Sequence, residues 1–177
     1  METIMKPPAK SRRTTDRKLR LCVVFDEPAS AVAADVMIRH VASDCQYETS
    51  SFHFDELDAP APGIAAARSA SDTDILVVAV RNDKNLPAHM RLWIGLCLGM
   101  RNEHQDGALV ALIIQAGKVE DLDSSLVDYL QTVAIIGGLT FFVKRRSACG
   151  RRRVSKWLPT KNTNPQLPNF REQVSTL

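Results

Sequence analysis

Residues 75–80 have the sequence Ile-Leu-Val-Val-Ala-Val, an unbroken apolar run rich in β-branched side chains. A strand that is covered on both faces shows such a run instead of alternating polar and apolar residues. Residues 19–25 repeat the pattern, interrupted only by Arg20. Both segments therefore predict central strands of a parallel sheet.

Amphipathic segments separate the predicted strands. Pro28 suits the first turn of a helix, and apolar residues recur at helical spacing from there to Val41. Residues 47–54 alternate as expected of an edge strand with one solvated face. The other predicted elements are an acidic loop at 55–62, helices at 63–70, 88–100 and 122–133, and strands at 108–114 and 139–143.

This order of elements predicts the fold. A strand followed by a helix occurs four times, and a fifth strand closes the pattern. Right-handed crossovers then give a doubly wound parallel sheet between two helical layers, with the flavodoxin-like strand order 2-1-3-4-5. The 177 residues suffice for one domain, predicted at 19–144, between a basic N-terminal arm (1–18) and a basic, proline-bearing C-terminal tail (145–177).

Charge is segregated along the chain. Residues 21–143 hold seven basic and 17 acidic residues, while the ends hold 16 basic and three acidic residues, so the total is +3. Such asymmetry indicates an anionic partner, or basic arms that lie on the acidic body of the same molecule. Six cationic side chains could bind nucleic acid through its phosphates: Lys144, Arg145, Arg146, Arg151, Arg152 and Arg153.

Composition excludes several classes of protein. The longest apolar run, residues 92–100, is far shorter than the roughly 20 residues of a membrane span. The N-terminus lacks the apolar segment of a secretory signal, and the four cysteines form no C-x-x-C pair. We therefore expect a cytoplasmic protein with no membrane span, no disulfide framework and no structural zinc site.

The predicted helix at 88–100 is apolar on nearly all sides. Such a helix is usually buried on both sides. Either a second subunit covers it, making a homodimer or another protein complex, or the C-terminal segment does so. Four apolar residues could anchor that segment on the domain: Trp157, Leu158, Leu167 and Phe170.

Ligands of open α/β sheets bind beyond the carboxyl ends of the strands. The first of these loops, Asp26-Glu27-Pro28, has two carboxylates and a proline where a phosphate cradle needs free amides, so we expect no flavin or dinucleotide cofactor. Asp26 and Glu27 could hold magnesium, or simply favour the helix N-terminus electrostatically. The predicted strand-edge site comprises Asp26, Glu27, Asp83, Gln115 and Lys144.

An acidic pair after the first strand and a lysine after the fifth resemble the response-regulator receiver domain. In that family the acidic pair helps to hold magnesium, and the lysine faces a phosphorylated aspartate at the end of the third strand. Asp26, Glu27 and Lys144 fit these places, but Val78-Ala79-Val80 stands where the phosphoacceptor is expected. The resemblance therefore implies the topology without the phosphotransfer chemistry.

Residues 19–143 also resemble a group of bacterial single-domain proteins, through the acidic first loop, the stretches 52–57 and 107–112, and Leu86-Pro87 leading to Trp93. This resemblance implies the fold and no activity. We therefore predict a non-catalytic, receiver-like regulatory or protein-interaction module. The alternatives are a nucleic-acid-associated protein that uses the basic tail, and a divergent metal-dependent hydrolase or nucleotide-handling enzyme that uses Asp26, Asp83 and Lys144.

Overall fold

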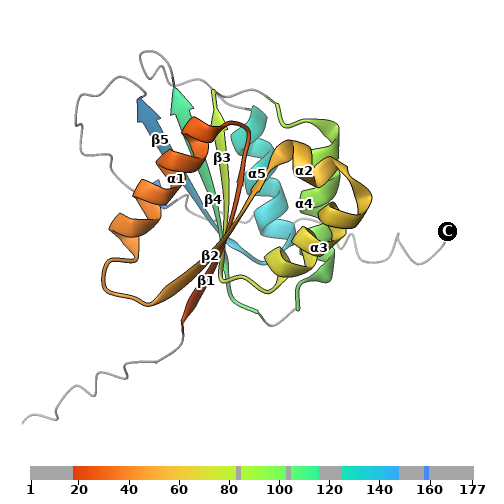
Figure 1. The fold of residues 1–177 in the computed structure, drawn as a ribbon, viewed down its shortest axis with the longest axis horizontal. Helices are drawn as coiled ribbons and strands as arrows, with labels where there is room; N and C mark the ends of the chain where they lie inside the picture. The colour runs from red at the N-terminus through yellow and green to blue at the C-terminus, as the bar shows by residue number, and fades with distance from the viewer. Residues whose placement is uncertain (1–17, 83–84, 103–104, 116–124, 148–157, 160–177) are drawn as a thin grey trace, which may run out of the picture.

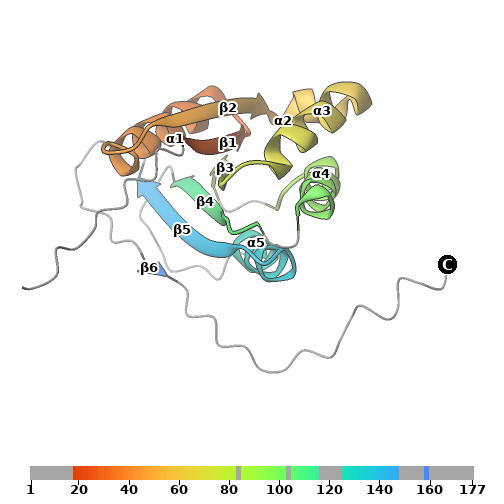
Figure 2. The same ribbon diagram turned by 90° about the horizontal axis from the view of Figure 1, so that it is seen from below.

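A sheet of five parallel strands forms the centre of the computed structural model (Figure 1). The structure describes residues 18–82, 85–102, 105–115, 125–147 and 158–159. The strand order is β2-β1-β3-β4-β5, as predicted, and Figure 2 shows the strands following one another in that order. Their bounds are β1 (Leu19–Phe25), β2 (Tyr47–His53), β3 (Ile75–Arg81), β4 (Ala108–Gln115) and β5 (Thr140–Ser147).

A short sixth strand, β6 (Leu158–Pro159), joins the edge of this sheet. It runs antiparallel to β5, so that Leu158 lies opposite Val143 and Pro159 opposite Phe142. The sequence analysis did not predict this strand.

The helices are divided unequally between the two faces of the sheet (Figure 1). One face carries α1 (Pro28–Val41), and the other carries α2 (Phe54–Asp58), α3 (Pro60–Ser71), α4 (Ala88–Met100) and α5 (Ser125–Ile136). Among the described residues, no helix is both long enough and apolar enough to cross a bilayer.

Alternate side chains of each strand enter separate cores. In β3, Val77 and Ala79 pack in the core that includes Met37 and Ile38 of α1. Their neighbours Leu76, Val78 and Val80 belong to the larger core beneath the other four helices. The unbroken apolar run of β3 thus reflects burial on both faces, as the sequence predicted.

The segment after β2 differs from the prediction. Residues 55–62 were expected to form a loop and 63–70 a helix, but α2 begins at Phe54 and α3 begins at Pro60. His53 and Glu56 form a capping box that starts α2. Pro60 lies in the first turn of α3, where a proline costs no helical hydrogen bond.

The end of β5 also differs from the prediction. The strand was expected to end at Val143, which would place Lys144 in the following loop. Instead β5 pairs with β4 as far as Ser147, so Lys144, Arg145 and Arg146 are strand residues. The predicted end of the strand was wrong because the apolar pattern stops at Val143 while the backbone pairing continues to Ser147.

Candidate functional site at the carboxyl ends of the strands

Asp26 ties the first loop to the neighbouring strand and to α1. One carboxylate oxygen accepts a hydrogen bond from the backbone N–H of Arg81, and the other accepts one from the hydroxyl of Ser30, both at 2.7 Å. Ser30 lies in the first turn of α1 and is completely buried. Both oxygens of the Asp26 carboxylate therefore have partners within the fold.

Glu27 faces the side chain of Arg81. Its two carboxylate oxygens lie 3.3 and 3.4 Å from one guanidinium nitrogen, in a partly exposed ion pair. Glu27 is the N-cap residue of α1 but its side chain makes no capping hydrogen bond. Its charge also lies near the positive end of the helix dipole.

His53, at the end of β2, connects the first loop to α2. Its Nε2 lies 2.9 Å from the carbonyl oxygen of Asp26, and its Nδ1 accepts a hydrogen bond from the backbone N–H of Asp55 at 3.2 Å. Both contacts fit a ring that carries its hydrogen on Nε2 and accepts at Nδ1. The ring also meets Phe25 edge-on, with the ring centres 5.4 Å apart. His53 thus has a structural role here.

The ends of β3 and β4 add amide groups to this edge. Asn82 has a left-handed backbone (φ 68°), and its N–H donates to the carbonyl oxygen of Ile114. Gln115 ends β4, and its side-chain oxygen is buried without a hydrogen-bond donor among the described residues. Asp83, the next predicted site residue, lies outside the described residues.

The three basic residues that end β5 are divided between the faces of the sheet by strand alternation. Arg146 donates to the carbonyl oxygen of Ala33 in α1, so it lies on the α1 face together with Lys144. Burial lowers the pKa of Lys144, and the nearby charge of Arg146 lowers it further. Arg145 lies on the opposite face.

Lys144 has apolar neighbours in the sheet. In register across the strands it lies beside Leu112, then Ala79, then Phe25. This row contains no carboxylate. Because β5 lies three strands from β1, Lys144 is separated from the first loop by about 14 Å at the usual strand spacing. The structure therefore does not bring Lys144 together with Asp26 through neighbouring strands.

The predicted strand-edge site is thus only partly assembled. Asp26 and Glu27 share the partner Arg81, and Ser30 and His53 join them. The sequence analysis missed Ser30 and His53 as members of this cluster. Ser30 lies four residues after Asp26, and this i, i+4 spacing is the one sequence signal that could have indicated the contact.

Metal binding by Asp26 and Glu27 stays a prediction. Within the described part of the chain, no three or more His, Cys, Asp or Glu side chains are grouped so that they could hold a metal ion. The Arg81 guanidinium faces Glu27, so its ion pair would have to open before a cation could replace it. The nucleic-acid contacts likewise stay a prediction, because Arg151, Arg152 and Arg153 lie outside the described residues.

Strand order and helix placement define a flavodoxin-like α/β domain. The sequence matches no protein-family model and no curated protein. A flavodiiron core from Synechocystis sp. PCC6803 is similar in structure, with a TM-score of 0.48 and 11% identity over 73% of this chain and 30% of that one. A flavodoxin from Streptococcus pneumonia TIGR4 gives a TM-score of 0.45 and 12% identity over 72% of this chain and 81% of that one. Neither similarity assigns a function.

Proposed function

We propose that this chain is a non-catalytic, receiver-like interaction module that acts as a homodimer through one face of α4. The exposed apolar surface of that helix is the observation that carries the proposal. The contacts at the strand edge support it, because Asp26 and Glu27 serve there to hold β1, β3 and α1 together.

The apolar surface is a seam along α4, made of Leu92, Gly95, Leu96, Gly99 and Met100. All five residues are exposed, and 76% of Leu92 is accessible. Their alternating three- and one-residue steps place them on one side of the helix, as in the seam of two packed helices. The opposite side of α4 is already buried in the core by Met90, Trp93, Ile94 and Cys97.

Packing among the described residues does not require either glycine of the seam. A Cβ atom added at Gly95 or at Gly99 would meet nothing within 4 Å. A glycine inside a helix costs about 1 kcal/mol relative to alanine. Close approach of a second helix would explain both glycines, because the missing side chains let two backbones come together.

The C-terminal end of α5 extends this seam. Tyr129 of α5 donates to the carbonyl oxygen of Arg91 in α4, so the two helices lie side by side. Ile136, at the end of α5, is 78% exposed and precedes Gly137, whose backbone approaches Leu98 of α4. The apolar surface thus spans both helices.

A second copy of this chain fits the seam. A two-fold axis at Leu96 would place Leu92 of one copy opposite Met100 of the other, so the same surface serves both subunits. Leu96 of each copy would then meet Leu96 of the other on the axis, and Gly95 and Gly99 would leave room beside this contact. The occupant of the seam in this proposal is therefore an identical chain.

The mass of the protein in solution tests the proposal. Sedimentation or light scattering between about 1 and 100 µM should give twice the 19.6 kDa of one chain. Leu92→Glu places one unpaired charge in the interface from each copy, at a cost of about 3 kcal/mol each. The dimer should therefore weaken by at least about 150-fold. Circular dichroism should show that this variant keeps its fold.

Val32→Glu is the matched control, because Val32 is 64% exposed on α1, on the other face of the sheet. It should remain a dimer. A wild-type protein that stays monomeric at 100 µM, or a Leu92→Glu variant that dimerises as the wild type does, would refute the proposal.

The non-catalytic part of the proposal has its own test. Acetyl phosphate and magnesium should leave the mass of the protein unchanged, since Ala79 occupies the position in register with Lys144. A gain of one phosphoryl group would contradict it.

A further inference from the structure

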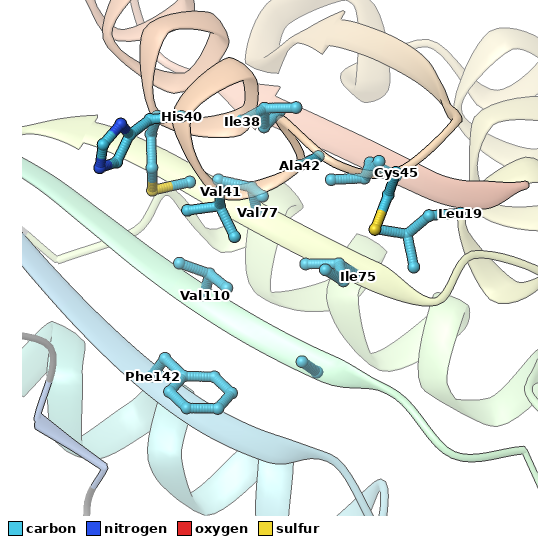
Figure 3. Close-up of a pocket in the computed structure, with 13 residues that line it drawn as sticks. Leu19, Ile38, His40, Val41, Ala42, Cys45, Ile75, Val77, Val110 and Phe142 are labelled. Carbon is cyan, nitrogen blue, oxygen red and sulfur yellow. The ribbon is translucent and has the colours of Figure 1, made fainter. Parts of the chain in front are cut away.

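A groove of about 500 Å³ runs along the face of the sheet that carries α1 (Figure 3). Its walls are the C-terminal half of α1 and the first residues of β1, β3, β4 and β5. Figure 3 shows Val41 above Val77, with Phe142 at the β5 end and Cys45 near Leu19 at the other. The volume of the groove is in the range of sites that bind small molecules.

The lining of the groove favours a hydrocarbon chain. All of the lining side chains except those of His40 and Cys45 are hydrocarbon or thioether. A polar group in the middle of a ligand would therefore lose its hydrogen bonds to water without gaining others. The groove crosses the three strand spacings from β5 to β1, about 14 Å in all. An extended chain covers about 3.5 Å for every three bonds, so about 12 bonds span this length.

Cationic side chains follow the β5 end of the groove. Lys144 and Arg146 lie on the same face of the sheet as Phe142, at successive intervals of two strand residues. Arg146 donates to the carbonyl oxygen of Ala33 in the first half of α1, whereas Phe142 lines the groove together with Val41 at the end of that helix. Lys144 is between these two contacts, so it lies beside the middle of α1.

His40 of α1 is on the same side of the groove. Ala33, Met37 and His40 are separated by four and three residues, so they share the side of the helix that Arg146 reaches. Met37 and His40 both line the groove. Figure 3 shows the imidazole of His40 projecting from α1 on the side of the groove away from Cys45.

The two cations of β5 repel each other. Burial lowers the pKa of Lys144, and the charge of Arg146 lowers it further. An anion beside Lys144 would offset this repulsion and would accept a charge-assisted hydrogen bond from the ammonium group. The groove thus combines an apolar channel with a cationic end.

We propose that the groove binds a single-chain anionic amphiphile, a free fatty acid of about 12 carbons, with its chain directed toward β1 and its carboxylate between Lys144 and His40. Burial of the chain supplies most of the affinity, and the contact with Lys144 orients the acid. The site lies on the α1 face and the seam of α4 on the other face, so this proposal goes beyond the homodimer and can fail without it.

Calorimetric titration of the full-length protein with dodecanoate, below its micelle-forming concentration, tests the binding. One molecule should bind per chain with a Kd near or below about 0.1 mM. Decanoate has two methylene groups fewer and should bind about 15-fold more weakly. A protein that does not bind dodecanoate, or that binds both acids equally, would overturn the proposal.

Cys45 reports where the chain lies, because it lines the groove and is exposed. Saturating dodecanoate should slow its alkylation by iodoacetamide several-fold, as followed by peptide mass spectrometry. Val41→Asp adds a carboxylate to the groove wall and should weaken dodecanoate binding at least about tenfold. Val32→Asp is the matched control, since Val32 is exposed on α1 outside the groove and the variant should bind as the wild type does. An unchanged alkylation rate, or equal losses in the two variants, would overturn the proposal.

Lys144→Met tests the position of the carboxylate. This variant should bind dodecanoate about tenfold more weakly and bind uncharged dodecanol as the wild type does. Equal losses for both ligands would mean that Lys144 only shapes the groove, and wild-type protein that binds dodecanol as tightly as dodecanoate would remove the role of the charge. Either result would overturn the proposal. Retention on anionic vesicles without binding of dodecanoate would also overturn it, because it would assign this surface to a membrane.

Discussion

Replacing Asp26 by alanine should destabilise the protein strongly, although the residue lies in a loop. The carboxylate is the partner of the Ser30 hydroxyl, which is completely buried. An orphaned buried hydroxyl costs about 2 kcal/mol. Losing the hydrogen bond from the backbone N–H of Arg81, which is partly accessible to water, adds about 1 kcal/mol.

The expected loss is therefore about 3 kcal/mol in the free energy of unfolding. At a urea m-value of about 2 kcal/mol/M, the unfolding midpoint should fall by about 1.5 M. A chain of this size should also lose roughly 6–12 °C in Tm. Urea titration followed by circular dichroism measures the midpoint.

Two further variants separate the contributions. Asp26→Ala/Ser30→Ala removes both partners, so it should be about 1–2 kcal/mol more stable than Asp26→Ala because no hydroxyl is left unpaired. Glu27→Gln removes an exposed ion pair and should cost less than about 1 kcal/mol. If Asp26→Ala proves as stable as the wild type, or more stable, the two acidic residues repel each other as in an empty cation site, and the structural role argued for Asp26 is wrong.

Three other perturbations test the packing. Trp93→Phe leaves the buried carbonyl of Gly63 without its donor at 2.9 Å and should cost about 2–3 kcal/mol in urea unfolding. Gly63→Ala brings a Cβ within 2.6 Å of a backbone oxygen and should lower Tm. Gly95→Ala meets no atom, so it should raise the stability of the monomer by up to about 1 kcal/mol while weakening the dimer. Equal effects of the two substitutions on Tm would contradict the packing described. Burial raises the pKa of Cys22 to about 11, against a weaker lowering by a hydrogen bond, and raises that of Cys97 as well. The two protonated thiols contribute their full stabilisation below pH 9. This stabilisation is lost as pH rises toward the folded-state pKa values, by at most about 1.4 kcal/mol per pH unit for each thiol. Urea midpoints at pH 8 and 10.5 should therefore differ less in Cys22→Ala/Cys97→Ala than in the wild type.

The sheet was predictable because burial leaves a local record in the sequence. The apolar runs of β1 and β3 show which strands are covered on both faces, and the alternation in β2 marks an edge strand. Strand order then followed from the handedness of the crossovers. Element ends were less predictable, since β5 continues through charged residues whose backbone still pairs with β4.

The strand-edge cluster was only half predictable. Asp26 and Glu27 could be located because they directly follow a strand, but their partner Arg81 is 54 residues further along the chain. No local pattern links residues so far apart.

By itself, the sequence determined most of the strands and helices, though not α2 or β6, because apolar periodicity follows from which faces must leave water. Only the tertiary structure decided what the polar and leftover apolar groups do. It paired the acidic loop with Arg81 and Ser30, left the seam of α4 exposed, and left a groove beside α1. These outcomes depend on contacts between distant residues and on how many helices fit each face, which no short stretch of sequence encodes.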